Sequence, residues 1–147
     1  PADVLAEAGV QRMGIELEYT VLDREKFVPS ANQGTIVVVA RDGTRAEAAA
    51  RLLDDSVTRM ETMIERRIME AVGGGCIVPM AVHADASPSG ARVIAEVLSV
   101  DGKRFVRLDE EISRDDYLGL SSQMGSRLVA IGGKDLADEA VRAFGAR

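Results

Sequence analysis

Three consecutive glycines, Gly73-Gly74-Gly75, divide the second half of this chain into a helical part and a sheet-forming part. Before them, residues 56–72 carry apolar side chains at every fourth position: Met60, Ile64 and Ile68. That spacing predicts an amphipathic helix, which a glycine run ends abruptly. Residues 76–84 then form an apolar run with the pattern of a strand. The chain must therefore change from helix to sheet at residue 73.

The rest of the second half continues this sheet and then returns to helix. Residues 92–100 and 103–108 are predicted strands around Asp101-Gly102, a pair that favours a two-residue type I′ turn. Two helices are expected at residues 115–131 and 134–144. The predicted fold class is therefore α+β, a three-stranded antiparallel sheet with helices on one face.

The first 53 residues have a different pattern. Helices are expected at residues 2–13 and 45–53, and a short strand at residues 15–19. The β-branched run Thr35–Ala40 does not alternate, which is typical of a strand buried on both faces of a parallel sheet. Such a strand needs neighbours, and the sequence offers at most one other weak strand. We therefore assign residues 1–53 to incomplete α/β domains and residues 54–147 to a complete α+β domain. An unpaired strand at 35–40 also favours self-association.

Composition excludes several classes of function. The net charge of −6 argues against a nucleic-acid partner and against a membrane-surface role, because both need a basic face. One cysteine and one histidine cannot form an internal disulfide or a dedicated zinc site. The chain starts without the basic and apolar regions of a signal peptide, and it has no apolar run long enough to span a bilayer. We expect a reducing, cytoplasmic compartment.

Cys76 is the most informative candidate site residue. The preceding glycines remove side-chain bulk and permit positive φ, which favours an exposed thiol with space for a bulky group. The alternative is a buried cysteine that packs as a small apolar residue. A redox role would need a second cysteine. A nucleophile paired with His83 is disfavoured, because an odd spacing on a strand places the two residues on opposite faces.

The other candidates are weaker. Gln33-Gly34 precedes the β-branched run, where a polar loop can present amides to a ligand. The run Glu65-Arg66-Arg67 on the predicted helix is typical of a solvated face. His83 is interpreted as an ordinary strand residue, and no metal site is expected.

Four segments together resemble the hydroxymethylbilane synthase (porphobilinogen deaminase) family. The most specific is Gly74-Gly75-Cys76-Ile77-Val78-Pro79, which matches the family's attachment motif Gly-Gly-Cys-x-Val-Pro. The other three are the helix Leu5–Gly14, the segment Phe27–Thr35, and Thr58 with Glu65-Arg66. The sequence departs from the family pattern at three positions: Asn32, Thr35 and Val39.

The resemblance implies a transferase that joins four porphobilinogen molecules, releases ammonia from each and gives linear hydroxymethylbilane. It implies a dipyrromethane primer bound to Cys76 through a thioether, with Gly75 in the attachment motif. It also implies that Gln33 and Gly34 line the cofactor side. In the family the catalytic Asp comes from the first domain, so no catalytic residue is assigned to this chain.

The family enzyme has three domains, and the resemblance implies that this chain holds the end of the second, part of the first and the complete third. We therefore expect a missing N-terminal half, or a separate chain supplying it, to provide the catalytic carboxylate and an arginine-rich cleft. The chain alone should be inactive. Two alternatives stay open. One is a non-catalytic interaction domain that docks a partner chain, and the other is a stand-alone thiol enzyme.

Overall fold

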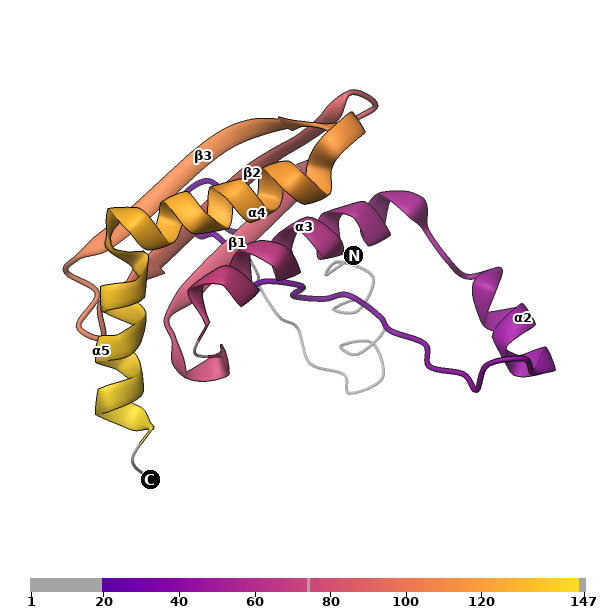
Figure 1. The fold of residues 1–147 in the computed structure, drawn as a ribbon, viewed down its shortest axis with the longest axis horizontal. Helices are drawn as coiled ribbons and strands as arrows, with labels where there is room; N and C mark the ends of the chain where they lie inside the picture. Colours follow the sequence, from indigo (N-terminus) through magenta and orange to yellow (C-terminus); the bar gives the residue numbers. More distant parts are fainter. Residues whose placement is uncertain (1–19, 74, 146–147) are drawn as a thin grey trace.

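A computed structural model describes residues 20–73 and 75–145. The elements in chain order, labelled as in Figure 1, are α2 (Arg45–Arg51), α3 (Ser56–Val72), η1 (Gly75–Ile77), β1 (Met80–Ala86), β2 (Gly90–Leu98), β3 (Phe105–Ser113), η2 (Arg114–Asp116), α4 (Tyr117–Leu128), η3 (Val129–Gly133) and α5 (Lys134–Phe144). The predicted helix 2–13 and strand 15–19 lie outside the described residues. No helix within the described ranges is long and apolar enough to cross a membrane.

The three strands form one antiparallel sheet in the order β1-β2-β3, as the sequence predicts. β1 and β3 start and end later than the predicted strands 76–84 and 103–108, whereas β2 starts and ends two residues earlier than the predicted strand 92–100. The hairpin also differs from the expected two-residue turn. Leu98 pairs with Phe105, so residues 99–104 form a six-residue connection. The Asp101 carboxylate stabilises this connection by accepting hydrogen bonds from Ser99 Oγ (2.6 Å) and Lys103 N (3.1 Å).

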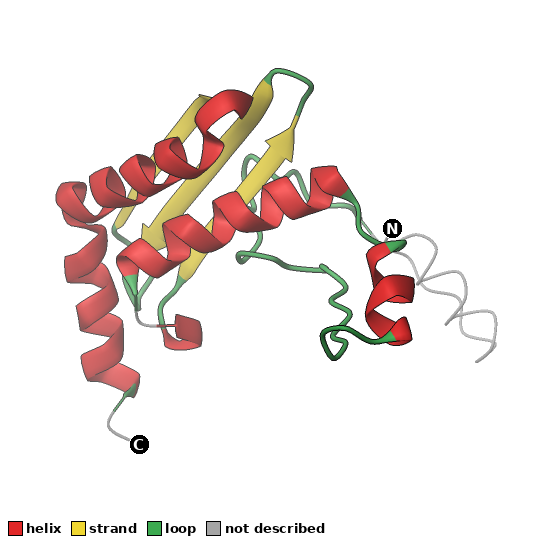
Figure 2. Ribbon diagram, turned by 45° about the vertical axis from the view of Figure 1, so that its right-hand side comes forward, coloured by secondary structure: helices red, strands yellow, loops and turns green. Residues whose placement is uncertain are grey.

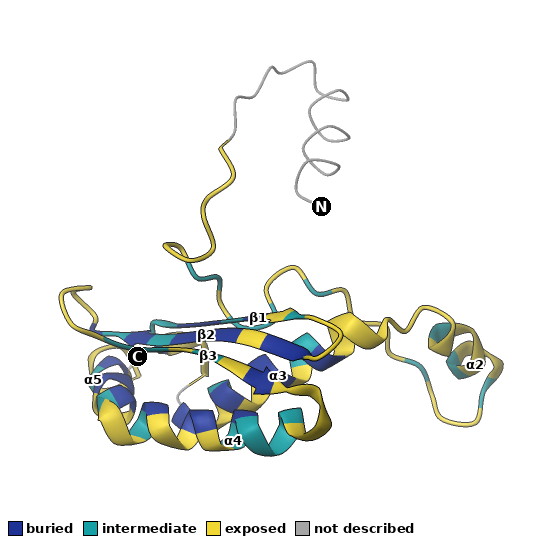
Figure 3. Ribbon diagram, turned by 90° about the horizontal axis from the view of Figure 1, so that it is seen from above, coloured by how far each residue is buried: buried dark blue, intermediate teal, exposed yellow. Residues whose placement is uncertain are grey.

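The helices cover one face of the sheet (Figures 2 and 3). Alternate residues of β2 point towards them and are fully buried: Ala91, Val93, Ala95 and Val97. On α3 the predicted stripe is buried as expected, with Ile64 and Ile68 at 0% exposure. Burying one such side chain contributes about 1.5–3 kcal/mol. The α+β fold class, with a three-stranded sheet and helices on one face, is therefore confirmed.

α3 and α4 approach each other closely at Gly125. A Cβ built there would lie 2.7 Å from the Cβ of Ala71 and 3.3 Å from the Cα of Ile68. Further along, the predicted break at Gly132-Gly133 appears as the π-helical turn η3, in which Gly132 has φ of 111°. Within the predicted helix 115–131, Met124 and Leu128 are buried, whereas Ile131 is 49% exposed.

The predicted strand Thr35–Ala40 is not formed, which corrects the sequence-based expectation. The residues lie outside any sheet, and Ile36 and Val39 are 91% and 90% exposed. The physical reason is that a β-branched run forms a strand only beside another strand, and the described residues provide none at this place. α2 follows, shorter than the predicted helix 45–53 and without buried residues. Figure 1 shows this part of the chain extending away from the sheet and its helices.

Candidate functional site

Cys76 lies on a short turn directly after α3. Gly73 ends the helix with φ of 76° and donates its N–H to Met69 O, and Gly75 follows with φ of 61°. The cysteine is the middle residue of η1, is exposed and forms no disulfide. The predicted strand over residues 76–84 is therefore wrong in its start, because β1 begins at Met80. Buried Val78, whose N–H donates to Gly75 O, anchors the turn beneath the thiol.

The surroundings of Cys76 leave space for a bulky group. A Cβ added at Gly73 or at Gly75 would meet no atom within 4 Å. The sequence predicts that Cys76 and His83 point to opposite faces of one strand. This prediction does not apply, because only His83 is on β1. The His83 ring instead lies 3.7 Å from Glu65 Oε1 and 3.5 Å from Arg24 Nη1. Its interpretation as a residue of the strand is confirmed.

Gln33 and Gly34 belong to a tight loop. Gln33 N–H donates to Ser30 O (3.1 Å), and Gln33 Oε1 accepts a hydrogen bond from Ser30 Oγ (3.1 Å). Asn32 and Gly34 both have positive φ, 59° and 81°. Asparagine is one of the few residues that tolerates this conformation, so Asn32 suits the position where the sequence departs from a family glycine.

Backbone and side-chain contacts fasten this loop to the α+β domain. Pro29 O accepts a hydrogen bond from Val82 N on β1 (3.0 Å), and Ala31 packs against the core. Asn32 N–H donates to Glu65 Oε2 on α3 at 2.6 Å. The loop that carries Gln33 and Gly34 is therefore positioned by both α3 and the edge strand.

Glu65 is a residue whose role the sequence analysis missed. The prediction of a solvated face holds for Arg66 and Arg67, but Glu65 is only 6% exposed. Its second oxygen, Oε1, accepts a hydrogen bond from Ala84 N at 2.9 Å. Burial raises the pKa of the Glu65 carboxyl, opposed by the two backbone hydrogen bonds and by the nearby His83.

Glu65 and Glu61 both accept hydrogen bonds from outward-facing N–H groups of β1, which is an edge strand. Three alternate N–H groups of β1 point away from β2: those of Val82, Ala84 and Ala86. Their acceptors are Pro29 O, Glu65 Oε1 and Glu61 Oε1. The spacing of the two glutamates, four residues apart on one helix face, is the signal that predicts a shared role. An edge covered in this way is protected from pairing with another chain.

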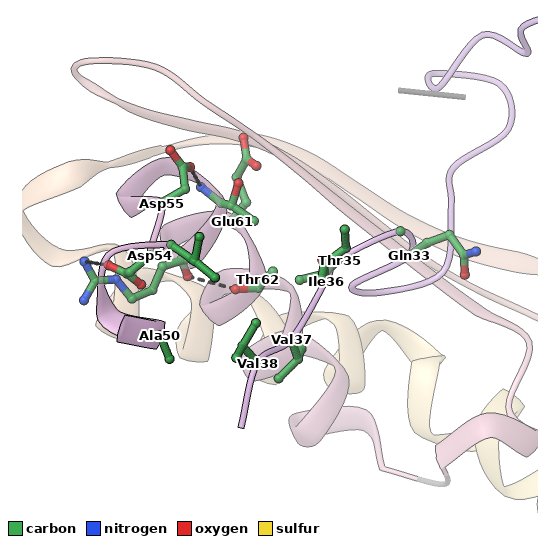
Figure 4. Close-up of a pocket in the computed structure, with 14 residues that line it drawn as sticks. Gln33, Thr35, Ile36, Val37, Val38, Ala50, Asp54, Asp55, Glu61 and Thr62 are labelled. Carbon is green, nitrogen blue, oxygen red and sulfur yellow. Dashed lines mark hydrogen bonds and ion pairs between the residues drawn. The ribbon is translucent and has the colours of Figure 1, made fainter. Parts of the chain in front are cut away.

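A cavity of about 670 Å³ lies beside this loop (Figure 4). It is lined by residues 33–38, by the end of α2 and by the first half of α3. Gln33 lies at the opposite end from Asp54 and Asp55, with its amide directed away from Val37 and Val38. Cys76 does not line it. The predicted site residues therefore form two groups. Gln33 and Gly34 line the cavity beside the first half of α3, whereas Cys76 follows the C-terminal end of this helix, in which each residue adds about 1.5 Å of length.

About half of the arginines in the described residues pair with carboxylates of the same chain. Seven form ion pairs with carboxylates: Arg51, Arg59, Arg66, Arg92, Arg104, Arg107 and Arg127.

Two family models match this chain. Residues 59–130 match the model described as porphobilinogen deaminase, C-terminal domain. Residues 1–51 match the model described as porphobilinogen deaminase, dipyromethane cofactor binding domain. The two matches follow each other in the chain without overlap.

Curated relatives with the same description span most of the chain. A probable porphobilinogen deaminase of Methanosarcina mazei is 44% identical over 140 residues, which are 94% of this chain and 44% of the relative. That of Methanococcoides burtonii is 46% identical over 140 residues, 94% of this chain and 45% of the relative. That of Nitrosopumilus maritimus is 33% identical over 137 residues, 92% and 44%. The chain therefore spans less than half the length of these relatives.

Proposed function

Because this chain belongs to the porphobilinogen deaminase family, we propose that it is the cofactor-carrying half of a hydroxymethylbilane synthase. In this proposal the complete enzyme joins four porphobilinogen units with release of ammonia, and its dipyrromethane primer is attached to Cys76. The observation that carries the proposal is the exposed Cys76 on a turn that two glycines of positive φ, Gly73 and Gly75, precede.

The residues at this turn fit a covalently held pyrrole. The thiol is accessible, and the positions of Gly73 and Gly75 leave open space beside it. Attachment forms one S–C bond at the carbon from which porphobilinogen has lost ammonia, and the thiol proton is released. When bound, the dipyrromethane supplies the terminal pyrrole to which further units are joined. Val78 in the core holds the turn, so the attachment point is fixed relative to the sheet.

Gln33 and Gly34 are proposed to line the cofactor side of the enzyme from the loop that is bonded to α3 and β1. This proposal is supported by the match of residues 1–51 to a model named for cofactor binding. Gly34, with φ of 81°, has no heavy atom within 4 Å of a Cβ built there, so the space on its Cα is open. No carboxylate of this chain is assigned the catalytic role.

A second polypeptide segment is proposed to complete the enzyme. The exposed run Ile36–Val39 and the exposed Leu52 and Leu53 form an apolar surface that a sheet of the missing half would cover. We place the domain boundary at residues 53/54 and the enzyme in the cytoplasm. Self-pairing of residues 35–40 is the competing arrangement, and a non-catalytic interaction domain would use the same surface to dock a partner chain.

Turnover measurements separate these possibilities. The purified 147-residue chain alone should form no hydroxymethylbilane from porphobilinogen, whereas the chain mixed with a polypeptide equivalent to the first half of a relative should form it. A positive colour reaction with an aldehyde reagent for pyrroles should accompany activity. Turnover by the chain alone would contradict the proposal of an incomplete enzyme. Binding of the added half without turnover or colour would favour the interaction domain.

A further inference from the structure

Glu65 joins three separate parts of the molecule through one carboxylate. It lies on α3, its Oε2 accepts from Asn32 N in the loop (2.6 Å), and its Oε1 accepts from Ala84 N on β1 (2.9 Å). The two donors are far apart in the sequence, and the carboxylate between them is buried. Hydrogen bonds to an ionised acceptor are shorter and stronger than neutral ones, which agrees with the Asn32 distance.

The pair of hydrogen bonds from Asn32 N and Ala84 N to Glu65, called the Glu65 joint below, requires a carboxylate. A glutamine of the same size has one acceptor oxygen, and its NH₂ group would face a backbone N–H donor. One of the two N–H groups would then lose its partner, and a buried unsatisfied donor is costly. Glu61 provides an internal comparison, because within the described residues it accepts a hydrogen bond from Ala86 N (2.9 Å) and none from the loop.

Glu65 holds the loop at Asn32, the residue directly before Gln33. Pro29 and Ala31 hold its beginning, but Asn32 has left-handed backbone geometry and is held through its N–H by Glu65. Gln33 and Gly34 follow immediately. A change at Glu65 should therefore alter the placement of these two residues. It should not alter the turn that carries Cys76, which lies beyond the C-terminal end of α3.

We propose that Glu65 is a positioning residue that fixes the Gln33–Gly34 loop against the domain that carries Cys76. It acts through the Asn32 amide and touches neither substrate nor cofactor. Its importance for turnover rests on the proposed function, whereas the two hydrogen bonds to Glu65 are independent of that function. The titratable or charged groups facing the joint are Glu61 on α3, His83 on β1, and Arg24, which contacts the His83 ring.

The joint is tested by following backbone amide resonances of the 147-residue chain by NMR while the pH is varied. Asn32 and Ala84 should titrate with one shared midpoint, because the same carboxyl group accepts from both. Glu65→Gln should abolish this shared titration. Glu61→Gln should preserve it and change the resonance of Ala86. Different midpoints for Asn32 and Ala84 in the unmodified chain would overturn the joint, and this measurement needs no variant to fold.

The positioning role is tested in the enzyme completed with the missing half. Glu65→Gln should still carry an adduct on Cys76 but should lower kcat by up to about 100-fold, as expected when a change away from the chemistry displaces a positioning segment by about 1 Å. Glu61→Gln should lower kcat much less. Equal kcat values for the two variants would overturn the positioning role. Absence of an adduct in the unmodified enzyme would instead contradict the proposed function and leave the NMR result standing.

Discussion

The guanidinium of Arg92 on β2 donates two hydrogen bonds to the carboxylate of Asp109 on β3, from Nε (3.0 Å) and Nη2 (2.9 Å). Its remaining nitrogen, Nη1, donates to Glu25 Oε1 at 2.5 Å. Glu25 precedes the loop by only a few residues, and its carbonyl accepts from Arg107 Nη2 (2.7 Å). The sheet face opposite the helices therefore holds the incoming chain through two arginines.

Replacing Arg92 with glutamine should release this segment. The ion pairs with Glu25 and Asp109 are lost together, so the amides of residues 23–27 should exchange with solvent severalfold faster in hydrogen–deuterium exchange. Arg127→Gln is the matched control, since Arg127 pairs with Glu110 and does not touch the segment. Equal exchange of residues 23–27 in both variants would show that Arg92 does not hold the segment.

The same substitution should change the acid response of Asp109. The hydrogen bonds from Arg92 lower the pKa of the Asp109 carboxyl from its usual 3.8. A lowered folded-state pKa contributes stability that is present above the usual value and is lost as the pH falls through the folded pKa. In Arg92→Gln the Asp109 pKa should rise towards 3.8, as measured by carboxyl NMR. An unchanged pKa would mean that another group stabilises the carboxylate.

Glu65 should give the opposite pH dependence. Its pKa is raised above 4.5 by burial, so the folded state binds more protons than the unfolded state in that window. The free energy of unfolding should therefore contain a contribution that falls as the pH rises from 4.5 through the folded pKa. Urea unfolding at several pH values should show this slope in the unmodified chain. The slope should be absent in Glu65→Gln, and its persistence there would assign it to another group.

The close contact of α3 and α4 should make Gly125 sensitive to added volume. Gly125→Ala places a methyl group 2.7 Å from Ala71 Cβ, so we expect a loss of about 1–3 kcal/mol in unfolding free energy. Ala71→Gly in the same chain should recover part of that loss, because it removes the nearest atom. The single variant Ala71→Gly serves as the control. A neutral Gly125→Ala would show that the helices separate at no cost.

Much of the α+β domain follows from local pattern. The four-residue spacing of Met60, Ile64 and Ile68 faces the core, and the glycine run ends α3 where expected. These features depend on contacts within one helix and one sheet. The length of the connection between β2 and β3 was mispredicted, because the Asp101 side chain stabilises a longer loop than the local turn preference favours.

The incorrect or missed features depend on distant partners. Thr35–Ala40 has a strong strand pattern, yet no strand lies beside it within the described residues, so the pattern alone cannot form a sheet. The buried position of Glu65 depends on two backbone amides contributed by other segments. Apart from its four-residue spacing from Glu61, this charged residue beside two arginines gives no local sign of such partners. The exposed Cys76 agrees with the interpretation favoured by the preceding glycines, over the alternative of a buried cysteine, because Gly73 and Gly75 adopt the positive φ of the turn.

The central claim is that Cys76 carries the pyrrole primer, and mass spectrometry of the Cys76 peptide tests it most directly. The chain should be completed with the missing half, supplied with porphobilinogen, digested and compared with Cys76→Ser treated in the same way. We expect an added mass of two linked pyrrole units on the Cys76 peptide and none in Cys76→Ser. An enzyme that turns over porphobilinogen while its Cys76 peptide keeps the unmodified mass would contradict this account.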